Sequence, residues 1–225
     1  PALQRFAHGA ALADLAPRSV LARSGPGDAS LTISGGSRAT TKPEVDGQVL
    51  GVRERSSGSA AGDIFQRRTG TEPAGPYVSL TWPTLERANE AQPYETELGS
   101  LTEALRGGGV SAAAIGNADG IDSVGDSYER QAGLALTDAS GTVPGGSLGK
   151  DLLRAAPAEP FGVRLDPTVV GARFLRAWTA AAPQGTKQGG VVLVEASDLA
   201  RTLRYRPIVD RDRYDELWAT SLRHT

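Results

Sequence analysis

Cysteine and methionine are absent from this chain of 225 residues, and histidine occurs only twice. Without cysteine the chain has no disulfide framework and no thiol chemistry. The two histidines, His8 and His224, are too few for a zinc site built on several histidine ligands. They also offer no convincing histidine for a Ser-His-Asp triad, and the sequence contains no Gly-x-Ser-x-Gly nucleophile elbow.

Long apolar runs and basic runs are missing as well. No stretch of about 18 consecutive apolar residues occurs, so we expect no membrane-spanning segment within this sequence. Lysine and arginine are scattered and the formal net charge is −2, which argues against a nucleic-acid partner. Because the sequence does not begin with methionine, we expect a processed segment of a longer chain, with any membrane anchor outside it.

From residue 83 onward the apolar pattern alternates between helical and strand periods. The predicted helices cover residues 83–91, 98–106, 148–155, 168–181 and 210–223. The predicted strands cover residues 110–115, 133–137, 161–165 and 191–195. Such alternation is typical of an α/β domain whose mainly parallel sheet is covered on both faces. We expect one such domain over residues 1–225, cut short at its C-terminus.

The earlier part of the chain is less regular. Its predicted elements are a helix over 2–15, a strand over 19–23, and a helix capped by Asp28 that runs through Ile33. Residues 37–76 are rich in serine, glycine, threonine and charge, and we expect a long loop excursion on the surface. Within it only a strand over 48–53 and a short helix over 63–67 are predicted.

The segment 189–198 is the most informative part of the sequence. It reads as a buried strand that ends on a carboxylate, Asp198, and is followed by a polar, helical tail. Open α/β sheets place their ligands at the carboxyl ends of such strands. Asp198 is therefore the leading candidate for a functional residue, and Asn117, which follows the predicted strand 110–115, is a candidate ligand-binding residue at the same edge.

A second candidate region is dense in hydroxyl groups. Residues 28–43 carry Ser30, Thr32 and Ser34 beside Asp28 and Arg38. A hydroxyl nucleophile at a helix N-terminus would suit phosphoryl or sulfuryl transfer, because the helix end stabilises an anion. The alternative is a capped helix followed by an ordinary Ser/Thr loop.

Three short motifs fit structural roles better than chemical ones. Residues 145–151 lack the first glycine and the Ser/Thr of a phosphate loop, so a turn leading into a helix is favoured. Residues 116–120 lack the third glycine of a dinucleotide fingerprint. The two acids of 210–212 open a predicted helix, where acidic residues favour the helix dipole.

Taken together, the segments 28–39, 98–116 and 191–198 resemble parts of the alkaline phosphatase superfamily, in a divergent branch from the envelope of actinobacteria. The resemblance implies a three-layer α/β/α sandwich, two metal ions that are usually zinc, and a Thr, Ser or Cys nucleophile. It also implies Asp and His ligands, including an Asp-x-x-x-His element in which Asp198 matches the aspartate. Thr202 stands where that element has histidine, and the nucleophile region near 28–30 lacks its usual context.

These departures favour a degenerate, non-catalytic domain that binds a small molecule or an envelope protein near Asp28, Arg38, Asn117 and Asp198. No cofactor is expected in that case, and the domain would be extracytoplasmic and anchored to the membrane through flanking segments. One alternative is a metal-dependent phosphoesterase or phosphotransferase. Its nucleophile would be Ser30, Thr32 or Ser34, its zinc ligands Asp28 and Asp198, and its anion clamp Arg38. Another is a structural assembly module of the envelope that docks through 37–76.

Overall fold

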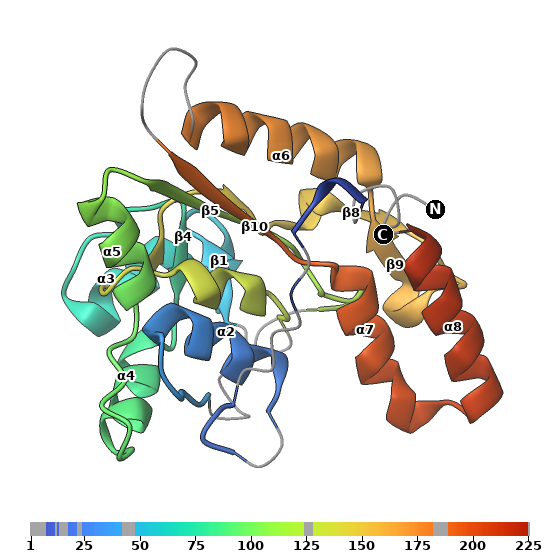
Figure 1. Ribbon diagram of the computed structural model, residues 1–225, viewed down its shortest axis with the longest axis horizontal. Coiled ribbons are helices and arrows are strands. Elements are labelled where there is room, and N and C mark those ends of the chain that lie inside the picture. The colour runs from blue at the N-terminus through green and yellow to red at the C-terminus, as the bar shows by residue number, and fades with distance from the viewer. Residues whose placement is uncertain are drawn as a thin grey trace.

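The computed structural model describes residues 8–11, 13, 18–21, 24–41, 48–123, 128–181 and 189–224, and Figure 1 shows their arrangement. Within these residues the chain has a mixed α/β fold with one parallel and one antiparallel sheet of three strands each, and two antiparallel pairs of two strands. None of the helices in the described ranges combines the length and the apolar character that crossing a membrane requires.

The parallel sheet has the strand order β10 (Gly190–Val194), β5 (Ser111–Ile115) and β7 (Gly146–Ser147). Ile115 is in register with both Val194 and Ser147, so the three strands end at the same level. The chain segments that follow them therefore meet at one carboxyl edge. The predicted strands 110–115 and 191–195 are confirmed as β5 and β10, but β10 is not the buried strand that the sequence predicts, since Val191 and Val194 are exposed.

Helices cover both faces of this sheet (Figure 1). Helix α6 (Pro167–Ala181) lies on one face, and α5 (Ser100–Gly107) and the 3-10 helix η2 (Gln131–Leu136) lie on the other. Asp166 begins α6 as predicted, because its Oδ1 accepts hydrogen bonds from the backbone N–H groups of Thr168 and Val169 at 2.9 and 3.2 Å. Pro167, at the first helical position, has no N–H that would need a partner.

The antiparallel sheet has the order β1 (Val49–Gly51), β4 (Tyr77–Ser79) and β6 (Thr142–Val143). Beside it lie the short hairpin β2 (Arg55–Ser56) and β3 (Ser59–Ala60), and the helices α3 (Ala61–Thr69) and α4 (Trp82–Glu90). Its core cluster consists of Leu50, Ala61, Ile64, Phe65, Val78, Leu80 and Tyr128.

This core corrects the expectation of a surface excursion over 37–76. In the described part of that range, 37–41 and 48–76, three strands and a helix form, and Leu50 and Phe65 are buried. The strand predicted over 48–53 and the helix over 63–67 are confirmed as β1 and α3, whereas their packing into a core depends on contacts that the local sequence pattern does not carry.

Helix α2 (Pro26–Gly35) packs against η2 and α5. It confirms the helix predicted through Ile33, but Asp28 lies in its first turn rather than at the N-cap. There the carboxylate accepts a hydrogen bond from the backbone N–H of Gly25 at 2.8 Å.

The C-terminal part forms a helical hairpin of α7 (Ser197–Tyr205), the 3-10 turn η5 (Arg206–Ile208) and α8 (Arg211–His224). Next to it lies a strand pair, β8 (Leu153–Ala155) with β9 (Val163–Leu165), together with the 3-10 turns η3 (Lys150–Leu152) and η4 (Pro160–Gly162). The helices predicted at 83–91, 98–106, 168–181 and 210–223 are confirmed as α4, α5, α6 and α8, and the strand at 161–165 as β9.

Two predicted elements are wrong. Residues 133–136 belong to η2 and do not form a strand. All of them are buried, so the run shows neither the helical nor the strand period of apolar residues that would distinguish a helix from a strand. Residues 148–155 form η3 and β8 instead of a helix, since Leu153 pairs with Leu165 in an antiparallel ladder. The predicted helix 2–15 and strand 19–23 lie largely outside the described residues, and Ser19–Leu21 is not in a strand.

Candidate functional site at the carboxyl edge of the parallel sheet

Asn117 joins the three segments that leave the parallel sheet. It is fully buried, and its backbone N–H donates to Ser197 Oγ at 2.9 Å, in the segment after β10. Its Nδ2 donates to the carbonyl of Leu148 at 2.8 Å, in the segment after β7. Its Oδ1 accepts from the N–H of Asp119 at 2.8 Å. The predicted position of Asn117 at the edge is correct, but these contacts use its side chain to hold the edge together.

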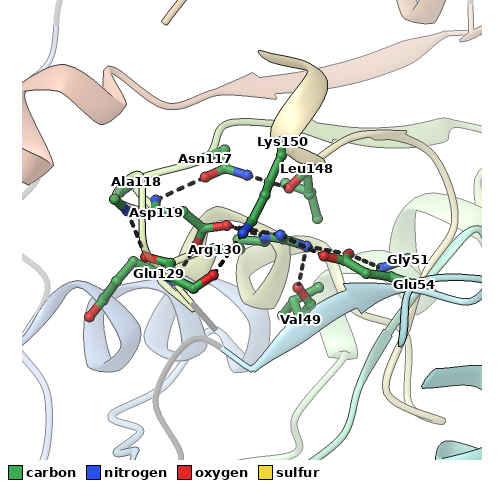
Figure 2. Close-up of polar contacts among 12 residues, drawn as sticks. Val49, Gly51, Glu54, Asn117, Ala118, Asp119, Glu129, Arg130, Leu148 and Lys150 are labelled. Atoms are coloured by element: carbon green, nitrogen blue, oxygen red, sulfur yellow. Dashed lines mark hydrogen bonds and ion pairs between the residues drawn. The ribbon is translucent and has the colours of Figure 1, made fainter. Parts of the chain in front are cut away.

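Arg130 forms the centre of a buried ionic network (Figure 2). Its guanidinium group donates two hydrogen bonds to Glu54, at 2.6 and 2.9 Å. It also contacts Asp119 Oδ2 through Nε at 2.9 Å and through Nη2 at 2.8 Å. Both Arg130 and Asp119 are fully buried, and the ring centroid of Tyr128 lies 4.5 Å from the guanidinium carbon. This matched geometry is the condition under which buried charges are tolerated.

The network sets the charge of its members. Burial would lower the pKa of Arg130, but its hydrogen bonds to Glu54 and the charges of Asp119 and Glu54 raise the pKa above its ordinary value. Burial likewise acts to raise the pKa of Glu54, and the bonds and charge of Arg130 outweigh it, so that pKa is lowered. Arg130 and Glu54 therefore both remain ionised around neutral pH.

A second buried arginine holds Asp198. The carboxylate Oδ1 of Asp198 accepts a hydrogen bond from the N–H of Leu165 at 2.9 Å and forms an ion pair with Arg201, one turn later on α7. Arg201 also donates to the backbone carbonyls of Asn117 at 2.6 Å and Asp119 at 3.3 Å. Arg201 thus links the end of β5 to the start of α7.

Thr202, where the resemblance expects histidine, faces a helix interface. Its hydroxyl donates to the carbonyl of Asp198 at 2.9 Å and lies 2.7 Å from Ser221 Oγ on α8. The residue is fully buried between the two helices. A metal-ligating side chain at position 202 would have to point toward the carboxylate of Asp198. The side chain of Thr202 instead packs in the contact between α7 and α8.

The outer part of the edge carries partly exposed charges. Glu129 and Arg204 form an ion pair at 3.1 Å, and both are half-buried. Burial raises the pKa of Glu129 and of Glu195, and the charge of Glu129 raises that of Glu195 further. Lys150 is exposed; its Nζ donates to the carbonyl of Ser123 at 2.7 Å, and Figure 2 shows the side chain pointing toward Arg130.

Asp28 is held in a separate network near the start of α2. Its Oδ1 accepts from the N–H of Thr41 at 2.7 Å and from the hydroxyls of Thr40 and Thr41 at 3.2 Å each. Arg38 donates to the hydroxyl of Tyr94 at 3.3 Å and lies over that ring. No hydrogen bond or ion pair between described residues joins Asp28 or Arg38 to the Asn117 and Asp198 edge.

The three candidate nucleophiles lie along α2. Ser34 is buried and accepts a hydrogen bond from the N–H of Gly99 at 3.0 Å, and Thr32 accepts one from the N–H of Ala39 at 3.3 Å. Ser30 is half-buried. Their role as nucleophiles stays a prediction. Among the described residues, no group of three or more His, Cys, Asp or Glu side chains is placed to hold a metal ion.

The sequence interpretation missed Glu54, Asp119, Arg130 and Arg201. Only Arg201 carried a usable signal, because it follows Asp198 by three residues on a predicted helix, where opposite charges pair. Arg130 and Glu54 lie far apart in sequence, and no local pattern connects them. Comparison with protein-family models, curated proteins and solved structures finds no match to this chain.

Proposed function

We propose that this chain is a non-catalytic, alkaline-phosphatase-like domain that binds a ligand or partner at the carboxyl edge of its parallel sheet. The observation that supports the proposal is the pairing of each buried carboxylate at this edge with an arginine: Asp119 with Arg130, and Asp198 with Arg201. Both oxygen atoms of Asp119 and the Oδ1 atom of Asp198 accept hydrogen bonds from protein donors, so this part of the edge is held in place as a frame.

The donors present do not fit the two-zinc centre that the resemblance implies. The Oδ1 atom of Asp198 is engaged by Arg201 and by the N–H of Leu165. Asp28 is engaged by Thr40, Thr41 and Gly25. A carboxylate that ligates a metal must offer its oxygen atoms to the ion, and a neighbouring guanidinium group competes for them with its positive charge.

The frame presents groups suited to recognition. Glu129, Glu195, Arg204 and Lys150 surround the buried centre and are within reach of solvent to different degrees. Charges of both signs, held on rigid elements, favour a polar small molecule or the polar surface of a protein. In the full proposal the domain is a three-layer α/β/α sandwich and the extracytoplasmic part of a membrane-associated envelope protein.

Turnover assays separate this proposal from the metal-dependent phosphoesterase. We expect p-nitrophenyl phosphate, bis-p-nitrophenyl phosphate and p-nitrophenyl sulfate to be hydrolysed no faster than by a Ser30→Ala/Thr32→Ala/Ser34→Ala variant, with zinc or magnesium present. Zinc-dependent hydrolysis that Asp198→Asn abolishes would establish the enzyme instead.

The location of binding needs its own measurement. A screen of carboxylated, phosphorylated and glycosylated small molecules, followed by amide hydrogen exchange, should protect residues 117–119, 128–130 and 195–204. A Glu129→Gln/Arg204→Gln variant, which changes only half-buried groups, should weaken that protection. If no compound protects these residues, the structural assembly module becomes the better interpretation.

A further inference from the structure

A hollow of about 350 Å³ lies between the outer strand β7 and helix α6. Its lining includes Tyr77, Ser147, Asp151, Arg173 and Arg176, together with two alanines of α6. β7 is last in the strand order and pairs only with β5 among the described strands. The hollow therefore opens along the side of the sheet and uses none of the charged residues of the carboxyl-edge site.

Small residues line the hollow. Gly146 has a φ of +114°, and a Cβ atom there would lie 1.9 Å from the carbonyl oxygen of Ala114. Only glycine fits this close approach of β7 to β5. On the opposite wall, Ala177 and Ala180 leave room between the helix and the strand. Volumes of this order are typical of small-molecule sites.

The lining is positively charged. Arg173 donates to Asp151 Oδ2 through Nη2 at 2.8 Å and through Nε at 3.2 Å, so these two charges cancel. Arg176 has no hydrogen bond or ion pair with any other described residue. An arginine left without an acceptor in a concave site is a receptor for an oxyanion, because its planar fork matches two oxygen atoms of one group.

Two hydroxyl groups line the hollow together with the guanidinium group of Arg176. Ser147 is buried at the end of β7, and Tyr77 is half-buried on β4. Neither hydroxyl forms a hydrogen bond with the described part of the chain. Three donor side chains from three different elements thus line one hollow, with Arg173 beside them.

We infer that this hollow binds the phosphoryl group of a small organic phosphate, with Arg176 as its principal contact. A phosphate monoester carries close to two negative charges and three acceptor oxygen atoms. It can therefore give the guanidinium and both hydroxyls an acceptor on separate oxygen atoms, and the charge that it presents to Arg176 is about twice that of a single carboxylate. The site is independent of the proposed function at the carboxyl edge, since the two share no residue.

Calorimetric titration with glycerol 3-phosphate tests the inference, with inorganic phosphate and citrate as comparison ligands. Arg176→Gln should weaken binding of glycerol 3-phosphate by about tenfold or more, the loss expected for one charge-assisted contact. The matched control is Arg211→Gln, which removes an exposed arginine of α8 and the same charge. It should bind like the parent chain.

Amide hydrogen exchange in the same samples should show protection at residues 146–151 and 173–180. Three results would overturn the inference: no binding of glycerol 3-phosphate, equal weakening by both variants, or citrate binding as tightly as the phosphate ester. Arg176 is exposed, so its replacement should leave thermal unfolding unchanged, and that measurement confirms that a loss of binding is not a loss of fold.

Discussion

Arg130 and Asp119 form an ion pair in which neither side chain is exposed, with 2.8 Å between Nη2 and Oδ2. The same guanidinium group binds Glu54, which follows β1 of the antiparallel sheet, whereas Asp119 follows β5 of the parallel sheet. One arginine therefore ties the two sheets together. The complete burial of Arg130 and Asp119 is tolerated because each has hydrogen-bonded partners.

Replacing Arg130 by Met should cost about 3–5 kcal/mol of unfolding free energy, because it leaves the carboxylates of Asp119 and Glu54 without their cation. Urea denaturation followed by circular dichroism measures the loss. Arg130→Lys should not restore it, since a single ammonium cannot reproduce the paired contacts.

The control for this prediction is Arg213→Met, which breaks an exposed i,i+3 pair with Glu216 on α8. Its effect should stay below about 1 kcal/mol. Equal losses in Arg130→Met and Arg213→Met would show that the buried network does not link the sheets.

Asp198→Asn tests whether this carboxylate is structural. The change removes the carboxylate that is paired with the buried charge of Arg201, and we expect a loss of about 3 kcal/mol. The thermal midpoint of the parent chain should be the same with zinc and with EDTA. A midpoint that EDTA lowers in the parent chain, but not in Asp198→Asn, would assign a metal to Asp198.

Glu195 should make the folded chain more stable toward acidic pH. Burial, the largest cause, raises its pKa in the folded chain above 4.5, so the folded state holds its proton to higher pH than the unfolded state. This contribution to stability is complete below pH 4.5 and is lost as the pH rises through the folded pKa. Glu195→Gln removes it. We therefore expect the stability of the parent chain relative to Glu195→Gln to increase as the pH falls from 7 toward 4.5.

Asp138 should have the opposite effect and make the folded chain less stable toward acidic pH. Burial acts to raise its pKa, but hydrogen bonds from Ser140 and Thr142 outweigh it, and the folded pKa lies below 3.8. Its contribution is present above pH 3.8 and is lost as the pH falls through the folded pKa. The parent chain should lose its advantage over Asp138→Asn in acid. Denaturant titrations of both variants at several pH values check the two signs, and parallel slopes would contradict them.

The sequence predicts the elements whose apolar period is local. β10 and α6 are examples, since an apolar run and an Asp-Pro start define them within a few residues. It fails at η2, which is buried on all sides, and at β8, which depends on a partner strand. In the site, Asn117 and Asp198 are placed at one edge by the strand pattern alone. The structural role of Asp198 depends on its ion pair with Arg201, and the connection between the two sheets depends on Arg130. The contacts of Arg130 are tertiary contacts, which a local sequence pattern does not predict.

Thr202→His restores the histidine that the alkaline phosphatase resemblance expects, and it provides a direct test of the non-catalytic proposal. Thr202 is fully buried, and its hydroxyl lies 2.7 Å from Ser221 on α8. An imidazole ring cannot fit without moving α8, so we expect a loss of about 1–3 kcal/mol or more from overpacking. Thr202→Val keeps the shape without the hydroxyl and should cost about 1 kcal/mol.

Zinc should not rescue Thr202→His, because Asp198 stays paired with Arg201 and the new ring has no second ligand beside it among the described residues. Thermal unfolding with and without zinc measures this. A zinc-dependent rise in the midpoint that disappears in Thr202→His/Asp198→Asn would mean that the metal site survives in all but one ligand. The unchanged midpoint that we expect would mean that one substitution at this helix interface does not create a metal site.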